Sequence, residues 1–468
     1  MTTILRNGPD LESLDKRYLF HPFTALADHE RTGPQVIVKG EGVWLEDAHG
    51  QRYLDGMAGL WCVNVGYGRP EIAEAIHRQA LTLPYFHSFS SWATDTPILL
   101  AEKLIEMAPV PMSKVFFGQS GSDANDTQIK IVWYYNNARG KPQKKKIIAR
   151  RRGYHGVTLA SASLTGMPSL HSGFDLPLDF VRHTTPPYRL WEAEPGQSDA
   201  DFVAKLARDL EDLILAEGPD TVGAVIMEPV MGAGGVIVPP KGYYPAIRAV
   251  LDRHDVLLIA DEVISGFGRL GTMFGATAME MQPDLISVAK GITSAYVPLS
   301  GCMVSEKVWR TIVDGQATLG VFGHGYTYSA HPLAAAAALA NLDIIEKDGL
   351  VEQAGRRGAF MHERLAEAFA DHPLVGDIRG HGLVGAVEFV AAKEPATRFE
   401  PSLKIAGRIV KAALAEGLIT RALPHADTIS FSPPFVISED EIALMVSRAR
   451  TAVDRVADEL VREGLWHG

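Results

Sequence analysis

Two ionisable side chains end apolar runs that are typical of buried strands. Lys290 closes LISVAK (285–290), and Asp261 follows LLIA within VLLIADEV (256–263). Taken alone, Lys290 is explained as the point where a strand reaches solvent, and Asp261 as a cap of a turn. Open α/β sheets, however, bind ligands beyond the carboxyl ends of their strands. The two residues therefore predict a crevice with an amine and a carboxylate facing one ligand.

Two further patterns could complete such a site. In SGSDANDTQIK, the run Ser120, Gly121 and Ser122 precedes a helical pattern, and amides and hydroxyls at a helix start bind anions. An ordinary serine N-cap is the alternative. Tyr154, in GYHG after the expected strand KIIAR, could cover a flat ligand, although a packed tyrosine is the plainer explanation.

An anion cradle, a buried acid, a lysine and an aromatic plate together describe one cofactor, pyridoxal 5'-phosphate. Its phosphate needs amides and hydroxyls, its aldehyde needs a lysine amine, and its ring nitrogen needs a carboxylate. The four features share one interpretation that none of them supports alone.

Six motifs in order carry a resemblance that covers nearly the whole chain: FFGQSGSDANDT, GYHG, MEPVMGAGG, IADEVISGFGRLG, SVAKG and GHGYTYSAHP. With them the chain resembles the class III aminotransferases, which are fold type I pyridoxal-phosphate enzymes. The resemblance implies a homodimer whose active sites lie at the subunit interface.

The resemblance also implies a role for each motif residue. Lys290 is expected to form a Schiff base with the cofactor and then to move a proton, while Asp261 pairs with the ring nitrogen. Tyr154 and Val263 are expected on opposite faces of the ring. The other cofactor-binding positions it implies are Ser120, Gly121 and Ser122 for the phosphate, Thr327 for the phosphate of the neighbouring subunit, Tyr326 beside it, and Glu228 as an acid near the cofactor.

Two departures from relatives bear on the substrate. Ornithine- and 4-aminobutyrate-type members usually carry glutamine in D-E-x-Q, where this chain has Ile264. Ornithine-type members also carry a carboxylate in G-E-A-G, where this chain has Ala233 in GAGG. Both differences point away from those two specificities. The stretch DGMAGLWCVNVGYG (55–68) instead resembles the ω-transaminases.

Within that group, Trp61 is expected to line the substrate pocket. Phe23, Phe89 and Tyr154 would complete an apolar wall that suits an amine without a carboxylate, although core packing explains the two phenylalanines equally well. Arg421 matches the mobile arginine of the group, which would bind a keto-acid carboxylate in two hydrogen bonds and swing aside for an apolar amine. A solvated loop arginine is the alternative.

These expectations describe an ω-transaminase that moves an amino group from an amine or ω-amino acid to pyruvate by a ping-pong mechanism. Alternatives are a dedicated taurine-, β-alanine- or polyamine-pyruvate aminotransferase and a diaminopelargonate-type aminotransferase. A non-catalytic pyridoxal-phosphate-fold binding protein is an alternative of another class, against which intact Lys290 and Asp261 count.

The elements that must position these residues alternate between strands and helices. Strands are expected at 222–229, 256–263, 285–290 and 300–305, with a helix at 243–254, which favours a mainly parallel α/β sheet. Helices dominate later, at 332–346, 351–370, 402–416 and 439–464, with short strands at 385–390 and 428–434. We expect an N-terminal segment (1–60) packing with the small domain, a large cofactor-binding α/β domain (61–330) and a smaller C-terminal α+β domain (331–468).

Composition excludes several other functions. The 468 residues carry a formal charge of −11, which argues against nucleic-acid and membrane-surface partners. The basic stretch KPQKKKIIARRR is interrupted by an expected strand and is interpreted as a solvated edge. Only two cysteines are present, no apolar run could span a bilayer, and neither HExxH nor paired CxxC occurs. A cytoplasmic enzyme of small amines and keto acids, without a metal, is expected.

Overall fold

The computed structural model describes residues 8–424 and 427–467. Its largest sheet has seven strands in the order β4-β10-β9-β8-β7-β5-β6. β10 is antiparallel to both of its neighbours, and the other printed pairings are parallel, so the predicted mainly parallel sheet is confirmed. The strands are β4 (Lys114–Gly118), β5 (Lys146–Arg150), β6 (Val181–Thr184), β7 (Val222–Met227), β8 (Leu257–Asp261), β9 (Leu285–Val288) and β10 (Ser300–Val304).

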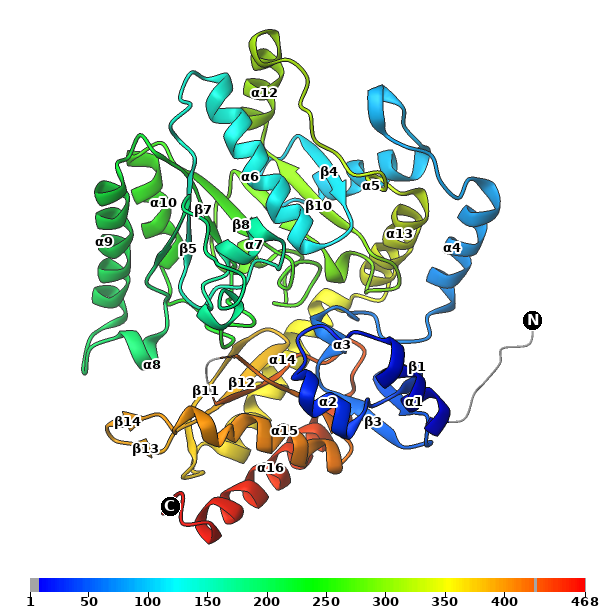
Figure 1. Ribbon diagram of the computed structural model, residues 1–468, viewed down its shortest axis with the longest axis vertical. Coiled ribbons are helices and arrows are strands. Elements are labelled where there is room, and N and C mark those ends of the chain that lie inside the picture. The colour runs from blue at the N-terminus through cyan, green and yellow to red at the C-terminus, as the bar shows by residue number, and fades with distance from the viewer. Residues whose placement is uncertain (1–7, 425–426, 468) are drawn as a thin grey trace.

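Both faces of this sheet are covered, because successive side chains of a strand point to opposite faces. In β7, Ala224 and Ile226 join the cluster that contains α6 (Gly121–Ala138) and α12 (Glu306–Leu319). Val225 and Met227 join the cluster on the other face, with α9 (Asp199–Glu217), α10 (Tyr243–Arg253) and the alanine-rich α13 (Pro332–Lys347). The chain therefore forms a three-layered α/β unit, the upper part of Figure 1.

The C-terminal third forms a second sheet, in the order β11-β12-β17-β16. Its strands are β11 (Val375–His381), β12 (Val384–Phe389), β17 (Thr428–Phe431) and β16 (Arg421–Ala422). The helices that follow the expected spacing are α14 (Leu350–Phe369), α15 (Ile405–Ala415) and α16 (Glu439–Arg462), and α16 contacts both of the others. This part lies below the large sheet in Figure 1.

The N-terminal segment lies beside the C-terminal part (Figure 1). Helices α1 (Gly8–Tyr18) and α2 (Leu26–Thr32) precede the strands β1 (Ile37–Glu41), β2 (Trp44–Asp47) and β3 (Arg52–Asp55). β3 pairs in parallel with β15 (Leu418–Ile419), which closes a third sheet. This pairing brings the start of the chain close to the strand that carries Arg421. The domain boundaries at 60 and 330 stay predictions.

Shorter elements connect these parts. They are α3 (Ala58–Trp61), α4 (Pro70–Thr82), η1 (Phe89–Ser91), α5 (Asp95–Glu106), α7 (Leu159–Leu164), η2 (Pro168–Leu170), α8 (Arg189–Glu192), α11 (Gly275–Ala278), η3 (Lys290–Ile292), β13 (Ala392–Lys393), β14 (Ala396–Thr397) and η4 (Pro401–Leu403). None of the helices in the described ranges is long and apolar enough to cross a membrane.

Candidate active site

Asp261 and Lys290 line the same cavity, which has a volume of about 320 Å³. Asp261 is the last residue of β8, and Lys290 opens η3 directly after the neighbouring parallel strand β9. Because every second residue of a strand points to the same face, Asp261 shares a face of β8 with Leu257 and Ile259. These two residues belong to the core cluster that contains α6, so the Asp261 side chain faces α6. The convergence that the two strand ends predicted is therefore present.

The backbone of Lys290 has an unusual conformation. Its φ is 49°, and φ at Trp61, another lining residue, is 58°. Left-handed φ is rare outside glycine, and such strained residues concentrate at functional sites. Burial lowers the pKa of Lys290 and the charge of Arg421 adds to this, while Cys62 and Asp261 oppose it. The direction favours a neutral amine, which is the nucleophilic form.

Three donors hold the Asp261 carboxylate in place. His155 Nδ1 lies 2.8 Å and Asn125 Nδ2 2.9 Å from Oδ2, and the backbone N–H of Val263 donates to Oδ1 at 3.1 Å. Asp261 is 4% exposed, so these bonds offset the cost of burying its charge. The sequence did not predict roles for His155 and Asn125, although GYHG and SGSDAND contain them, because their contacts with Asp261 are long-range.

At the start of α6, Ser120 is an N-cap, which was the alternative to an anion site. Ser120 Oγ accepts from the Asp123 amide at 3.2 Å, and the Asp123 carboxylate accepts from the Ser120 amide at 2.9 Å, which is a capping box. Gly121 and Ser122 line the cavity, whereas Ser120 is exposed and lies outside the lining. A Cβ on Gly121 would lie 3.0 Å from Val263, so a larger residue would crowd the cavity.

Tyr154, Val263 and Glu228 also line the cavity. The Glu228 carboxylate accepts hydrogen bonds from the Tyr154 amide at 3.2 Å and the Gly232 amide at 2.8 Å. Burial raises the pKa of Glu228, while His155 and Arg150 oppose the shift. The contacts indicate that Glu228 positions the backbone that carries Tyr154.

The ring of Trp61 lies close to two basic side chains of the cavity. The guanidinium carbon of Arg421 is 4.8 Å from the centroid of the indole ring, and Lys290 Nζ is 5.6 Å from it. Burial lowers the pKa of Arg421 and Tyr154 opposes this, but a guanidinium stays charged at neutral pH. Arg421 is therefore a partly buried cavity residue, in disagreement with the alternative of a solvated loop arginine.

The rest of the wall is largely apolar. Leu60, Val230 and the two departures from relatives, Ala233 and Ile264, all line the cavity. Phe23 also reaches the lining but is 68% exposed, which places it at the mouth. A side chain entering this cavity meets hydrocarbon next to the Arg421 guanidinium.

Besides Ser120, three predicted site residues lie outside the cavity of this chain. Phe89 is 45% exposed, and a Cβ on Gly325 would lie 3.1 Å from its ring. Tyr326 donates its hydroxyl to the Asp123 carbonyl at 3.2 Å, and the carbonyl of the exposed Thr327 accepts from Tyr85. The segments that carry Phe89 and Thr327 therefore meet on one surface, where neither side chain lines the cavity of this chain.

Comparisons with known proteins agree with this geometry. A family model for aminotransferase class-III matches residues 25–453. The diaminobutyrate–2-oxoglutarate transaminase of Halomonas elongata is 50% identical over 97% of this chain and 98% of its own length. The mitochondrial gamma aminobutyrate transaminase 1 of Solanum lycopersicum is 44% identical over 97% of this chain and 88% of its own length. A structure of the omega transaminase from Pseudomonas jessenii in complex with PMP has a TM-score of 0.94 at 46% identity, covering 96% of this chain and 99% of that one.

The chain belongs to the class III aminotransferases. It has the fold type I architecture of these enzymes, and they use pyridoxal phosphate as cofactor. The cavity fits this group, because a buried carboxylate, an amine of lowered pKa and the amides of a helix start all border it. His155 Nε2 and Asn125 Oδ1 are buried polar atoms without a hydrogen-bond partner in the described part of the chain. Both residues line the cavity, so its wall contains polar groups whose hydrogen-bonding capacity is not fully used within the chain.

Proposed function

We propose that this enzyme is an ω-transaminase that transfers an amino group from an amine or ω-amino acid to pyruvate by a ping-pong mechanism. One observation carries the proposal: Arg421 stacks on Trp61 beside Lys290, in a cavity whose other walls are largely apolar. A guanidinium binds the carboxylate of a small keto acid, and hydrocarbon walls accept the side chain of an amine.

The proposed roles of the residues follow from their positions. Asp261, fixed by His155 and Asn125, would hold the cofactor ring nitrogen, and Gly121 and Ser122 would hold its phosphate. When bound, the cofactor supplies an electron-withdrawing aromatic ring at the reacting carbon. The Lys290 amine attaches the cofactor and then carries a proton to and from that carbon, which its lowered pKa favours.

Arg421 makes one cavity suitable for two kinds of substrate. Its cation–π contact with Trp61 keeps it near the wall in this structure. It can bind a carboxylate when the substrate has one and lie against the indole when the substrate has none. Such a movement explains how an apolar amine and a keto acid could use the same site in turn.

Absorbance spectroscopy of the two half reactions tests this function. Holoenzyme mixed with 1-phenylethylamine alone should lose the absorbance of its aldehyde form, and pyruvate added afterwards should restore it. Product formed only when both substrates are present together would contradict the ping-pong mechanism. A spectrum that does not respond to amines or ω-amino acids would contradict the proposed donor class.

The alternative to pyruvate as the amino acceptor is 2-oxoglutarate. The Halomonas relative is named for 2-oxoglutarate and diaminobutyrate, both of which carry carboxylates. The same spectroscopic experiment separates the two functions if 2-oxoglutarate is compared with pyruvate in the second half reaction. Faster regeneration by 2-oxoglutarate would replace the proposed acceptor, and faster amination by diaminobutyrate would replace the proposed donor class.

We further propose a cytoplasmic homodimer. Cys62 and Cys302 are free thiols, which suits a reducing compartment. Aromatic residues cluster where the segments that carry Phe89 and Thr327 meet. Four of these aromatic residues are exposed, namely Phe86, Phe89, Trp92 and Tyr328. Exposed apolar patches of this kind mark interfaces. If a second subunit covers these residues, Thr327 and Phe89 of this chain would lie next to the cavity of that second subunit.

A further inference from the structure

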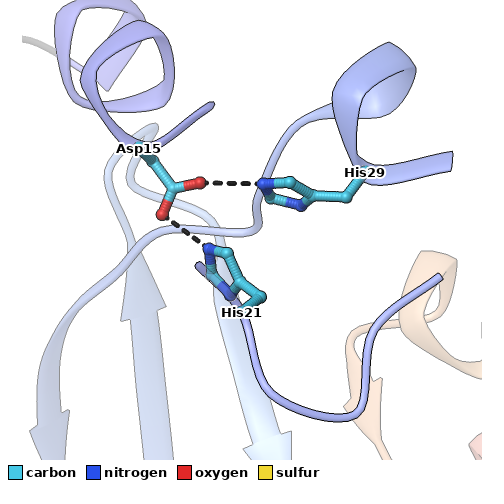
Figure 2. A group of neighbouring side chains, drawn as sticks. All are labelled: Asp15, His21 and His29. Atoms are coloured by element: carbon cyan, nitrogen blue, oxygen red, sulfur yellow. Dashed lines mark hydrogen bonds and ion pairs between the residues drawn. The ribbon is translucent and has the colours of Figure 1, made fainter. Parts of the chain in front are cut away.

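A cluster of three potential metal ligands lies in the N-terminal segment, outside the cavity. Asp15 is on α1, His29 is on α2, and His21 is on the loop between them (Figure 2). One ligand atom from each residue can be chosen so that all three lie within 4.8 Å of one another. The residues are six and eight positions apart, so the fold of α1 and α2, rather than a local motif, brings them together.

The geometry of the cluster is compatible with one bound cation. His21 Nε2 lies 2.8 Å from Asp15 Oδ2, and His29 Nε2 lies 3.1 Å from Asp15 Oδ1. Ligand atoms that surround one transition-metal ion at about 2.1 Å are themselves roughly 3 Å apart. The two imidazole rings face the same carboxylate with centroids 4.4 Å apart. Small adjustments would place all three groups around a common centre.

Hydrogen bonding does not fully account for these contacts. His21 makes a hydrogen bond to Asp15, but Asp15 Oδ1 and His29 Nε2 are buried atoms without a hydrogen-bond partner among the described residues, and their only contact with each other is an ion pair at 3.1 Å. The side chains of His29 and Asp15 are 11% and 13% exposed. The His29 imidazole and the Asp15 carboxylate thus face each other at ion-pair distance without hydrogen-bond geometry, and a cation held between them would bind both atoms.

We propose that Asp15, His21 and His29 bind one divalent transition-metal ion, Zn²⁺ or a chemically similar ion. Two imidazoles and one carboxylate suit zinc, nickel and cobalt, whereas magnesium and calcium prefer oxygen ligands alone. Three protein ligands leave coordination positions for water, as in other three-ligand zinc sites.

The position of the cluster gives the ion a structural role. His21 directly precedes Pro22 and Phe23, which line the mouth of the active-site cavity. A bound ion joins α1, this loop and α2 at one point, and so restrains the loop that carries the two lining residues. The binding itself does not depend on the proposed transamination, because no ligand of the ion lies in the cavity lining.

Isothermal titration of the untagged, cofactor-loaded protein with Zn²⁺ tests the site, with bound metal counted by elemental analysis after dialysis. Wild-type protein should bind one equivalent per subunit. His29→Gln and Asp15→Asn should each weaken that binding more than about a hundredfold, since even outer-shell partners of a metal contribute 10- to 100-fold. His49→Ala is the matched control, because His49 pairs with Glu12 of α1 at 2.8 Å without a second imidazole.

The results distinguish a metal-binding site from a set of ordinary ion pairs. Loss of the single equivalent in His29→Gln and Asp15→Asn, with its retention in His49→Ala, supports the proposal. Failure of the wild type to bind, or equal binding by wild type and His29→Gln, would overturn it. Cofactor absorbance and circular dichroism of each variant show that a lost site is not a misfolded chain. Trypsin cleavage near Arg17 and Arg31 should also slow when Zn²⁺ is added to wild type and not when it is added to His29→Gln.

Discussion

At the residue scale, the active site depends on a few side chains whose surroundings change their ordinary chemistry. Burial makes Lys290 a weaker base than a surface lysine, and three hydrogen bonds keep Asp261 fixed in an apolar setting. Arg421 is partly buried against an indole rather than exposed to water. Each of these environments has a consequence that a single substitution can test.

Replacing Lys290 with alanine should remove the amine that carries the proton. We expect Lys290→Ala to bind the cofactor without a covalent bond and to lose roughly 10²–10⁴-fold in turnover, the usual contribution of a positioned acid–base group. Single-turnover absorbance after mixing with amine measures the loss. Turnover at the wild-type rate would show that Lys290 has no part in the chemistry.

Replacing Arg421 with alanine should affect one substrate much more than the other. A hydrogen bond to a charged group contributes about 1.5–3 kcal/mol, so we expect KM for pyruvate to rise roughly 10- to 150-fold. KM for an apolar amine should change less than about threefold, because hydrocarbon walls bind its side chain. Steady-state kinetics with each substrate varied in turn makes the comparison, and equal changes in both values would exclude Arg421 as the carboxylate anchor.

At the element scale, Asp261 at the end of β8 and Glu262 directly after it are two acids with different surroundings. Asp261 faces the cavity, whereas the Glu262 carboxylate accepts from the amides of Gly275 and Ala276, at the start of α11, and from Ser265. Glu262 thereby joins the end of β8 to α11. Burial raises its pKa from about 4.5 to about 7, with the hydrogen bonds opposing the shift. The strand end therefore contains a carboxyl group whose charge changes near neutral pH.

This shift predicts a pH-dependent stability. Between about pH 4.5 and pH 7 the folded protein binds more protons at Glu262 than the unfolded chain, so this group's stabilising contribution is full below pH 4.5 and is lost as pH rises to about 7. The loss amounts to at most roughly 3 kcal/mol. Glu262→Gln should flatten the decline in unfolding midpoint over this range.

The control for this measurement is an acid with the opposite shift. Glu211 binds Arg253 and His254, which lower its pKa to about 2, so its contribution is present above its ordinary pKa and is lost as pH falls toward 2. Glu211→Gln should leave the decline between pH 4.5 and pH 7 unchanged. If the unfolding midpoint falls equally steeply between pH 4.5 and pH 7 in wild type and Glu262→Gln, the pH dependence does not come from Glu262.

How far the elements could be predicted depends on how local their signals are. Strands such as β7 and β9 follow from short apolar runs because both of their faces are buried. Helices α10 and α16 follow from helical spacing because one face of each is buried. The antiparallel direction of β10 and the left-handed φ of Lys290 have no local signal, since both depend on distant partners.

The candidate site shows the same division. Lys290 and Asp261 could be predicted because each closes an apolar run of the sequence, and Arg421 because it matches the mobile arginine of the family. The contacts of His155 and Asn125 with Asp261 join residues more than a hundred positions apart, which spacing does not reveal. The cluster of Asp15, His21 and His29 was missed for a related reason, because it matches no standard metal motif.

At the scale of the whole molecule, two of the residues predicted for the site do not line the cavity of this chain. Thr327 and Phe89 lie on an aromatic surface away from the cavity, where Trp92 is 59% and Tyr328 is 56% exposed. If a second subunit covers this surface, a charge placed there should separate the subunits, because an unpaired charge is costly at an apolar interface.

We expect Trp92→Glu with Tyr328→Glu to yield monomers that bind cofactor weakly and lose most of their activity. Sedimentation velocity measures the assembly, and cofactor absorbance after dialysis measures retention. Leu215→Glu is the control, since Leu215 is 53% exposed on α9, far along the chain from this surface. A dimer that persists in the double variant would place the interface elsewhere, and a fully active monomer would show that each subunit is sufficient.

The pairing of β3 with β15 also affects how the chain is synthesised. β3 leaves the ribosome early, but its parallel partner at Leu418 and Ile419 is made only when most of the protein has been translated. Until then β3 has an open edge, and exposed edges of this kind recruit other chains. Slow translation or premature termination before residue 418 should therefore yield aggregated product, even though the seven strands of the large sheet have all been made by then.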